Sequence, residues 1–332
     1  MEKVKIPVWK LVWNGKDVTE DLIPYVLSVT YEDVYHGESD TIEITLENRD
    51  GRWLQSWYPE KGDTVILSIG YKDEPHLPCG EFEIDEMEFA GSRTSGDTVH
   101  LRGIAAPFKK SIREKRTVAY ENVTLSKIVK LIAERNGMNA FVELDSDPSF
   151  KRIDQKQKAD LTFLRELAEK YNASVKVQGN TTYFVSNDKL KERKPALAIE
   201  RKDIISYALR DKTHNIYKGV IITYHDPKTK KLLKYREDWT GYKAGADYLK
   251  VNERVESLEE AKLRARALRH RYDSKEKTGR ITMPGNPQVM AGLVVALKGF
   301  GLMDGNWLIE RTRHTISRTG GWVTELEVRK TS

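Results

Sequence analysis

The sequence predicts an α+β fold that is mostly β, with two related small antiparallel β-barrel modules flanking an α+β middle domain. Runs of alternating apolar and polar residues, typical of half-buried strands, fill both ends of the chain. Pairs of glycines are separated by the same number of residues in both ends of the chain, whereas the middle of the chain shows mainly the periodicity of helices. We therefore expect a first β-barrel domain at 1–105, an α+β middle domain at 106–195 and a second β-barrel domain at 196–332.

The first module is organised around residues 37–103. Its expected strands alternate with period two and are separated by turn residues: 8–13, 26–31, 41–47, 64–69, 81–85 and 98–102. Met87 and Phe89 are out of phase with Phe82 and Ile84, which predicts a β-bulge near Asp85-Glu86.

The same module recurs near the C-terminus. Its strands and turns repeat in order, although the loops differ in length. The matched segments are Val65–Ile69 with Leu293–Leu297, Gly80–Ile84 with Gly305–Ile309, and Gly96 with Gly321. Both glycine pairs are sixteen positions apart. These three matches indicate a duplicated β module.

The middle domain is expected to hold two helices and a hairpin. One helix follows Thr124 and ends at Asn136-Gly137, and the other starts with Asp160 as its N-cap. A hairpin turns at Gly179-Asn180.

The last domain is expected to contain a further hairpin and a long helix. The hairpin spans 219–235, with its turn at Asp226-Pro227-Lys228. The helix is expected at about 257–273, with Ser257 and Glu260 as a capping box.

Composition is that of a folded chain with modest cores. Of 332 residues, 39% are hydrophobic and 32% charged. No apolar run approaches the roughly 20 residues that cross a membrane, and the N-terminus lacks a signal peptide, so we expect no membrane insertion. The single cysteine, Cys79, forms no internal disulfide, which favours synthesis in a reducing cytoplasm.

Charge is distributed unevenly. Residues 1–104 hold 10 Lys and Arg against 21 Asp and Glu, a net charge of −11. Residues 105–195 hold 19 against 12, giving +7, and residues 196–332 hold 27 against 17, giving +10. The two related modules therefore carry opposite charge.

No catalytic, cofactor or metal site is predicted. Seven histidines are scattered without metal-ligand spacing, and no phosphate-binding or dinucleotide motif is present. An acidic run on the strand after Gly80 is interpreted as a solvated face, or one that faces a neighbouring subunit or a channel: Glu81, Glu83, Asp85, Glu86 and Glu88. The basic residues of the 257–273 helix are interpreted as a solvated face in preference to a nucleic-acid surface.

Taken together, these residues resemble the phage late control protein D family, tail proteins related to the baseplate hub of contractile phages and to the N-terminal part of VgrG-type spike proteins. The resemblance covers nearly the whole chain through short motifs in order: Gly37–Thr41, Trp53 through Gly62-Asp63, Gly80–Asp85, Glu121–Leu125, Asp160–Leu164, Met290–Gly292, Gly299–Gly301, His314 and Gly320-Gly321.

The resemblance implies a homotrimeric hub with two barrels per chain. Six similar barrels would match a hexameric tail tube protein on one side and a separate trimeric spike protein on the other. Other baseplate proteins would be further partners. DNA would be only passing cargo, and the protein would reside in the tail baseplate of a virion or tail-like particle, assembled in the bacterial cytoplasm. No lysozyme, peptidase, oligosaccharide-binding or needle domain is recognised.

Two other functions stay open, a baseplate-associated cell-wall hydrolase and a DNA-binding late-gene regulator. The charge contrast adds a hypothesis about assembly: in a ring the acidic and basic modules alternate, since like charges repel. The alternative is that the acidic face lines the channel and repels DNA.

Overall fold

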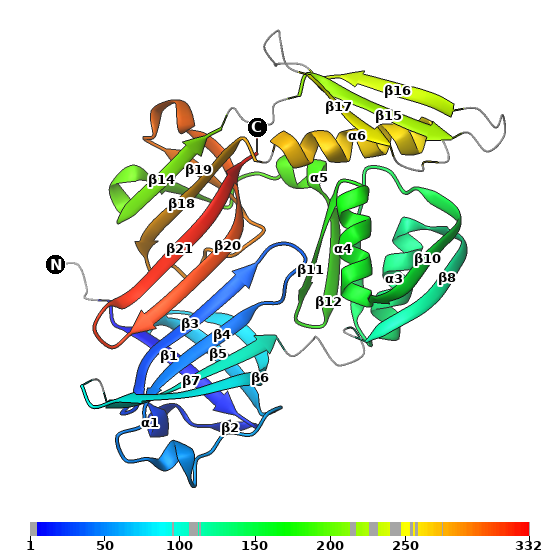
Figure 1. The fold of residues 1–332 in the computed structure, drawn as a ribbon. Coiled ribbons are helices and arrows are strands. Elements are labelled where there is room, and N and C mark those ends of the chain that lie inside the picture. The colour runs from blue at the N-terminus through cyan, green and yellow to red at the C-terminus, as the bar shows by residue number, and fades with distance from the viewer. Residues whose placement is uncertain are drawn as a thin grey trace.

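The strands of both chain ends join in one 13-stranded sheet, the largest element of this computed structural model (Figure 1). The structure describes residues 5–94, 96–105, 112, 114–212, 217–225, 232–239, 247–252, 255, 258–273 and 275–331. Smaller sheets of two, three and three strands account for the other paired strands of these residues. The predicted fold class, α+β and mostly β, is confirmed.

The N-terminal module comprises the elements before residue 106: β1 (Pro7–Trp13), β2 (Lys16–Asp17), α1 (Thr19–Leu22), β3 (Val26–Val34), β4 (Thr41–Glu47), η1 (Arg52–Leu54), β5 (Thr64–Tyr71), β6 (Leu77–Ser92) and β7 (Gly96–Ala105). Period-two alternation drives its burial, because Ile42, Ile44 and Leu46 point into the core while Glu43 is exposed.

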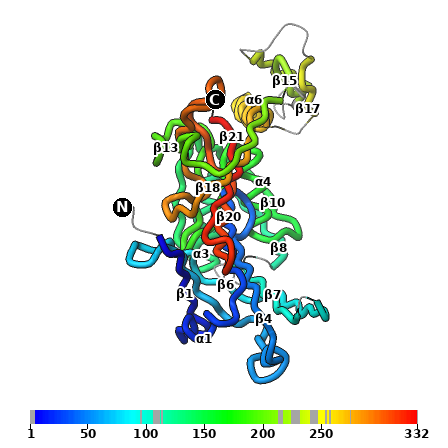
Figure 2. Tube along the Cα trace, turned by 90° about the vertical axis from the view of Figure 1, so that its left-hand side faces the viewer, coloured from blue at the N-terminus to red at the C-terminus, as the bar shows by residue number. Residues whose placement is uncertain are grey.

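The C-terminal module comprises β13 (Leu197–Glu200), η2 (Arg201–Asp203), β14 (Ser206–Asp211), β18 (Lys277–Pro284), β19 (Val294–Lys298), η3 (Gly301–Met303), β20 (Gly305–Ser317) and β21 (Gly321–Lys330). Its core surrounds the fully buried Trp307. Figure 2 shows this module above the N-terminal one, with β20 reaching from one to the other.

The two modules have the same strand order, which confirms the predicted duplication. One reads β3-β4-β7-β6-β5-β1, and the other reads β14-β18-β21-β20-β19-β13. Gly80, near the start of β6, and Gly305, the first residue of β20, have φ of 111° and 128°, a region open almost only to glycine. One difference is that β1 is antiparallel to β5 whereas β13 is parallel to β19.

The predicted register of the repeat is wrong by two residues in one strand. Leu67 lies opposite Gly80 and Leu297 lies opposite Gly305, so Leu297 is the equivalent of Leu67. The sequence match had paired Leu297 with Ile69. Residues 293–297 are all apolar, so their pattern carries no phase by which to choose between the two alignments.

The predicted bulge is confirmed, and it occurs in both modules. The register of β6 against β7 shifts between Ile84 and Glu86, and that of β20 against β21 shifts between Ile309 and Arg311. The extra residue in the first module is Asp85. Each bulge bends a long strand, and beyond it the strand stays paired with β7 or β21 but no longer pairs with β5 or β19.

The middle unit, residues 115–191, has its own apolar core. It contains β8 (Lys115–Thr124), α3 (Leu125–Arg135), β9 (Asn139–Glu143), β10 (Ser149–Ala159), α4 (Asp160–Lys170), β11 (Ala173–Gln178), β12 (Thr181–Ser186) and α5 (Asn187–Lys191). Both predicted helices and the hairpin at Gly179 are present.

Asp160 has a different role from the one predicted. The N-cap of α4 is Ala159, and Asp160 is the first residue within the helix. Its buried carboxylate accepts hydrogen bonds from Arg135, at 2.6 Å, and from Asn136 and Gln155. The charge of Arg135 makes this burial tolerable.

An insertion separates β14 from β18 in the sequence. It forms its own sheet from β15 (Gly219–His225), β16 (Leu232–Asp238) and β17 (Tyr248–Asn252), and α6 (Leu258–Asp273) lies against it (Figure 1). The sequence had not separated this layer from the second module. Ser257 and the hairpin turn at Asp226-Pro227-Lys228 lie outside the described residues.

The equivalent core positions give a test of the duplication. Replacing Phe82 or Trp307, both fully buried, with alanine is expected to lower the free energy of unfolding by about 3–5 kcal/mol in each case, because each leaves a large cavity. Urea unfolding followed by circular dichroism measures the change. A loss below about 1 kcal/mol at either position would contradict the assigned cores.

Candidate functional site

The acidic run predicted from sequence lies along β6 but does not form a catalytic centre. Glu81, Glu83, Asp85 and Glu88 are all exposed. Glu81 and Glu83 lie where β6 pairs with β5, Asp85 is the bulge residue, and Glu88 lies beyond the bulge opposite His100. The strand brings these carboxylates to one surface, and only the part beyond the bulge forms a sheet edge.

A second charged surface joins the two modules within the chain. Beyond its bulge, β20 pairs with β3 from Arg311, opposite Val34, to Ser317, opposite Ser28. Basic side chains of β20 and the following turn contact acidic ones of the N-terminal module: Arg311 with Glu32 and Glu38, Arg313 with Glu43 at 3.1 Å, and Arg318 with Glu47 at 2.7 Å. The intrachain joint is therefore one of opposite charges.

A buried carboxylate lies at the point where three parts of the chain meet. Asp33 on β3 is fully buried. It forms an ion pair with Lys176 of the middle unit, and it accepts a 2.8 Å hydrogen bond from the backbone N–H of Ala291 in the C-terminal module. No sequence motif identifies this contact, because its partners are 143 and 258 positions away.

Asp40 lies beside this carboxylate and accepts a 3.0 Å hydrogen bond from the backbone N–H of Val34. Burial, together with the negative charge of Asp33, raises the pKa of Asp40 to about 7 from 3.8. One ammonium, that of Lys176, cannot neutralise two buried carboxylates, so Asp40 binds a proton readily.

His314, one of the residues that carried the resemblance, is a core residue. Its Nδ1 lies 3.0 Å from Thr324 Oγ1, and its Nε2 lies 3.1 Å from the carbonyl oxygen of Val289. Burial lowers its pKa to about 4, so the ring is neutral near pH 7, and a proton on Nε2 suits the carbonyl. Its role here is structural.

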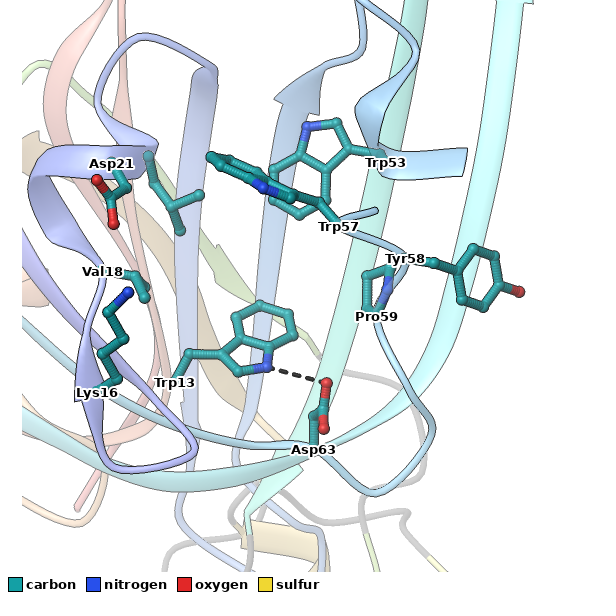
Figure 3. A pocket seen from close by; sticks show the side chains of 10 residues that line it. Trp13, Lys16, Val18, Asp21, Trp53, Trp57, Tyr58, Pro59 and Asp63 are labelled. Atoms are coloured by element: carbon teal, nitrogen blue, oxygen red, sulfur yellow. Dashed lines mark hydrogen bonds between the residues drawn. The ribbon is translucent and has the colours of Figure 1, made fainter. Parts of the chain in front are cut away.

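A pocket of about 290 Å³ opens at the far end of the N-terminal module (Figure 3). Trp13, Trp53 and Trp57 line it, and Trp13 donates a 2.9 Å hydrogen bond to Asp63. The sequence reasoning missed this pocket, although tryptophans close to turn residues were a signal for it.

One carboxylate that lines the pocket, Asp63, is held in its charged form. Burial raises the pKa of Asp63, but hydrogen bonds from Asn14, the Glu60 N–H and Trp13 outweigh it and lower that pKa below 3.8. A carboxylate so held stays ionised at neutral pH and does not act as a general acid.

The basic helix is partly neutralised by its own neighbours. Lys262 pairs with Glu259 at 3.1 Å, and Arg269 pairs with Asp273 at 3.4 Å. His270 is buried, and its Nε2 lies 3.2 Å from a guanidinium nitrogen of Arg329. This arrangement favours a helix packed on its sheet over a nucleic-acid surface.

Across the described residues, no group of three or more His, Cys, Asp and Glu side chains is arranged to hold a metal ion. In the same part of the chain, no helix is both long and apolar enough to span a membrane.

Comparison with known proteins points to phage tails. The chain is 27% identical over 234 residues to a probable baseplate hub protein of Escherichia phage 186, covering 68% of this chain and 58% of that protein. It is 31% identical over 180 residues to a probable baseplate hub protein of Escherichia phage P2, covering 54% and 45%. The chain is similar to phage baseplate hub proteins. It spans about half the length of these curated relatives, and no family model matches it.

Solved structures share the fold at low sequence identity. The 43 kDa tail protein of prophage MuSo2 from Shewanella oneidensis has a TM-score of 0.77 at 14% identity, covering 98% of both chains. A tail protein from Neisseria meningitidis has a TM-score of 0.75 at 13% identity, covering 98% of this chain and 96% of that one. An E. coli component of the type VI secretion system reaches 0.63 at 13% identity, over 97% and 77%.

Lys176 gives a test of the buried junction. Replacing it with methionine is expected to lower the free energy of unfolding by about 3–5 kcal/mol, because the Asp33 carboxylate is left buried without its partner. The matched control is Lys189→Met, which removes an exposed ion pair of the same middle unit and is expected to change little. Equal effects in a urea titration would show that Asp33 does not depend on Lys176.

Asp40 gives a pH-dependent prediction. Its folded pKa of about 7 exceeds its ordinary 3.8, so between these values the folded state binds more protons than the unfolded state. The stability that Asp40 contributes is fully present below pH 3.8 and is lost as pH rises through about 7. The wild-type free energy of unfolding minus that of Asp40→Asn should therefore fall over this range. A difference that stays flat or rises would contradict the shift.

Proposed function

We propose that this chain is a structural baseplate hub protein of a contractile phage tail or a tail-like injection particle. Three copies would form a ring of six similar modules that joins a hexameric tail tube to a trimeric spike, within the tail baseplate. The observation that carries the proposal is the duplicated module, because one chain then supplies two similar positions of a ring. Similarity to two probable baseplate hub proteins supports it.

In this proposal the protein works by geometry and performs no chemistry. Its partners are two further copies of itself, the tail tube protein, the spike and other baseplate proteins. DNA passes through the ring without being read. The particle would be assembled in the bacterial cytoplasm.

Features of the described residues disfavour the two other candidate functions. A hydrolase is disfavoured by Asp63, whose carboxylate is held ionised in the tryptophan-lined pocket. A DNA-binding regulator is disfavoured by the ion pairs along α6. Should either function exist, activity on peptidoglycan, or DNA binding that weakens steeply with salt, would reveal it.

Light scattering coupled to size exclusion tests the proposal. We expect a species of three times the 38.2 kDa of one chain, alone or together with the neighbouring spike protein. Each interface of an obligate trimer should bury on the order of 2,000 Å² or more. A stable dimer, or a monomer in every condition with the spike included, would overturn the hub assignment.

A further inference from the structure

Besides β2 and β13, two strands of the large sheet have an edge with no strand partner within the described residues. One such edge is that of β6 over Glu86–Gly91, because β5 pairs with β6 only as far as Glu83. The other is the outer edge of β14, which pairs with β18 on its inner side and ends the sheet. Such edges offer backbone N–H and C=O groups to another strand.

These are the strands that form the joint between modules elsewhere in the chain. By the order of the repeat, β6 corresponds to β20, and β14 corresponds to β3. The pair β20–β3 is formed within the chain, whereas β6 lies in the lower module of Figure 1 and β14 in the module above it. A single chain therefore makes this joint once and leaves the matching halves of a second one.

If the second joint is unfilled in a single chain, a residue of β14 should be more exposed than its equivalent on β3. The equivalences follow from the shared pairing, since Tyr31 lies opposite Ile42 as Leu209 lies opposite Gly279. Val29 on β3, covered by β20, is 1% exposed, whereas its equivalent on β14, Tyr207, is 43% exposed. An aromatic side chain on a free sheet edge is typical of a contact surface.

Charges at the two joints are reversed. The same equivalences match acidic and basic residues at five positions: Glu32 with Arg210, Glu43 with Arg280, Glu86 with Arg311, Glu88 with Arg313, and Arg102 with Glu327. One ion pair occurs in both modules with its acidic and basic residues exchanged: Arg311 pairs with Glu327 at 3.8 Å, and Glu86 pairs with Arg102 at 3.6 Å.

We propose that residues Glu86–Gly91 of β6 pair, antiparallel, with Tyr207–Lys212, along β14 and the residue after it, in a second copy of this chain. The inference rests on the proposed hub function and specifies its subunit interface. The register repeats that of the intrachain joint, so Glu88 lies opposite Arg210 just as Arg313 lies opposite Glu32. Glu86 then faces Lys212, and Ala90 faces Ala208.

The reversed charges select this joint over the wrong ones. If β6 met β3 of another copy, Glu88 would face Glu32, and if β20 met β14, Arg313 would face Arg210. Both contacts place like charges directly across a strand pair, which is unfavourable. Of these three contacts between copies, only β6 with β14 brings together opposite charges, as β20 with β3 does within the chain, so acidic and basic modules alternate along the assembly.

Cysteine cross-linking tests the register. In an Ala90→Cys/Ala208→Cys variant, facing residues have Cα atoms about 4.5–5.5 Å apart, within the range of a disulfide. Oxidation is expected to give covalent multimers, up to three chains, on a non-reducing gel. The control Ala90→Cys/Ser206→Cys is two residues out of register and should cross-link poorly. The native Cys79 is buried, so cross-linking through it should be slight.

Charge reversal tests the selection. The variants Glu86→Lys/Glu88→Lys and Arg210→Glu/Lys212→Glu should each weaken assembly by about tenfold or more, and the four substitutions combined should restore it. The matched control is Glu81→Lys/Glu83→Lys, on the same strand but beside β5, which should assemble as the wild type does. Circular dichroism checks that every variant is folded.

The outcomes separate the inference from the proposed function. A trimer that cross-links equally in both cysteine variants, or that tolerates every charge reversal, overturns the β6–β14 joint and leaves the hub intact. A chain that forms no trimer in any condition overturns both. Cross-linking in register, with rescue by the fourfold variant, establishes the joint.

Discussion

A single buried carboxylate contacts both modules and the middle unit at the point where they meet. Asp33 belongs to β3 of the N-terminal module, its ion-pair partner Lys176 to the middle unit, and its hydrogen-bond donor Ala291 to the C-terminal module. A charge with no exposure is tolerated only while both partners stay in place. The angle between the modules, on which the geometry of any ring depends, is therefore tied to this group.

The bulge gives the repeated strand its two functions. Before the bulge, β20 completes its own module by pairing with β19, and beyond it the same strand pairs with β3. A β-bulge bends and twists a strand, which lets β20 contribute to both modules within the one sheet. Gly305 at the start of β20 and Gly321 after its end have positive φ, as do Gly80 and Gly96 in the other module.

Sequence reasoning found the local features and missed the long-range ones. Period-two alternation and the glycine spacing identified the strands, the bulge at Asp85 and the repeat. Residues 293–297 are all apolar and show no alternation, so their predicted alignment with β5 was wrong by two residues. The separate sheet of the insertion and the contact between Asp33 and Lys176 depend on distant segments, which no local pattern encodes. Of the acidic residues selected, Glu88 lies on the free edge, whereas Glu81 and Glu83 lie beside β5.

The pairing of β20 with β3 also sets the order in which the molecule can be completed during synthesis. Thr30 and Thr315 lie 3.2 Å apart across this joint, yet 285 residues separate them in the chain. Because synthesis proceeds from the N-terminus, β3 leaves the ribosome long before its partner exists. The first module therefore waits with an open edge while the residues between β3 and β20 are made. Only then can β20 cover that edge.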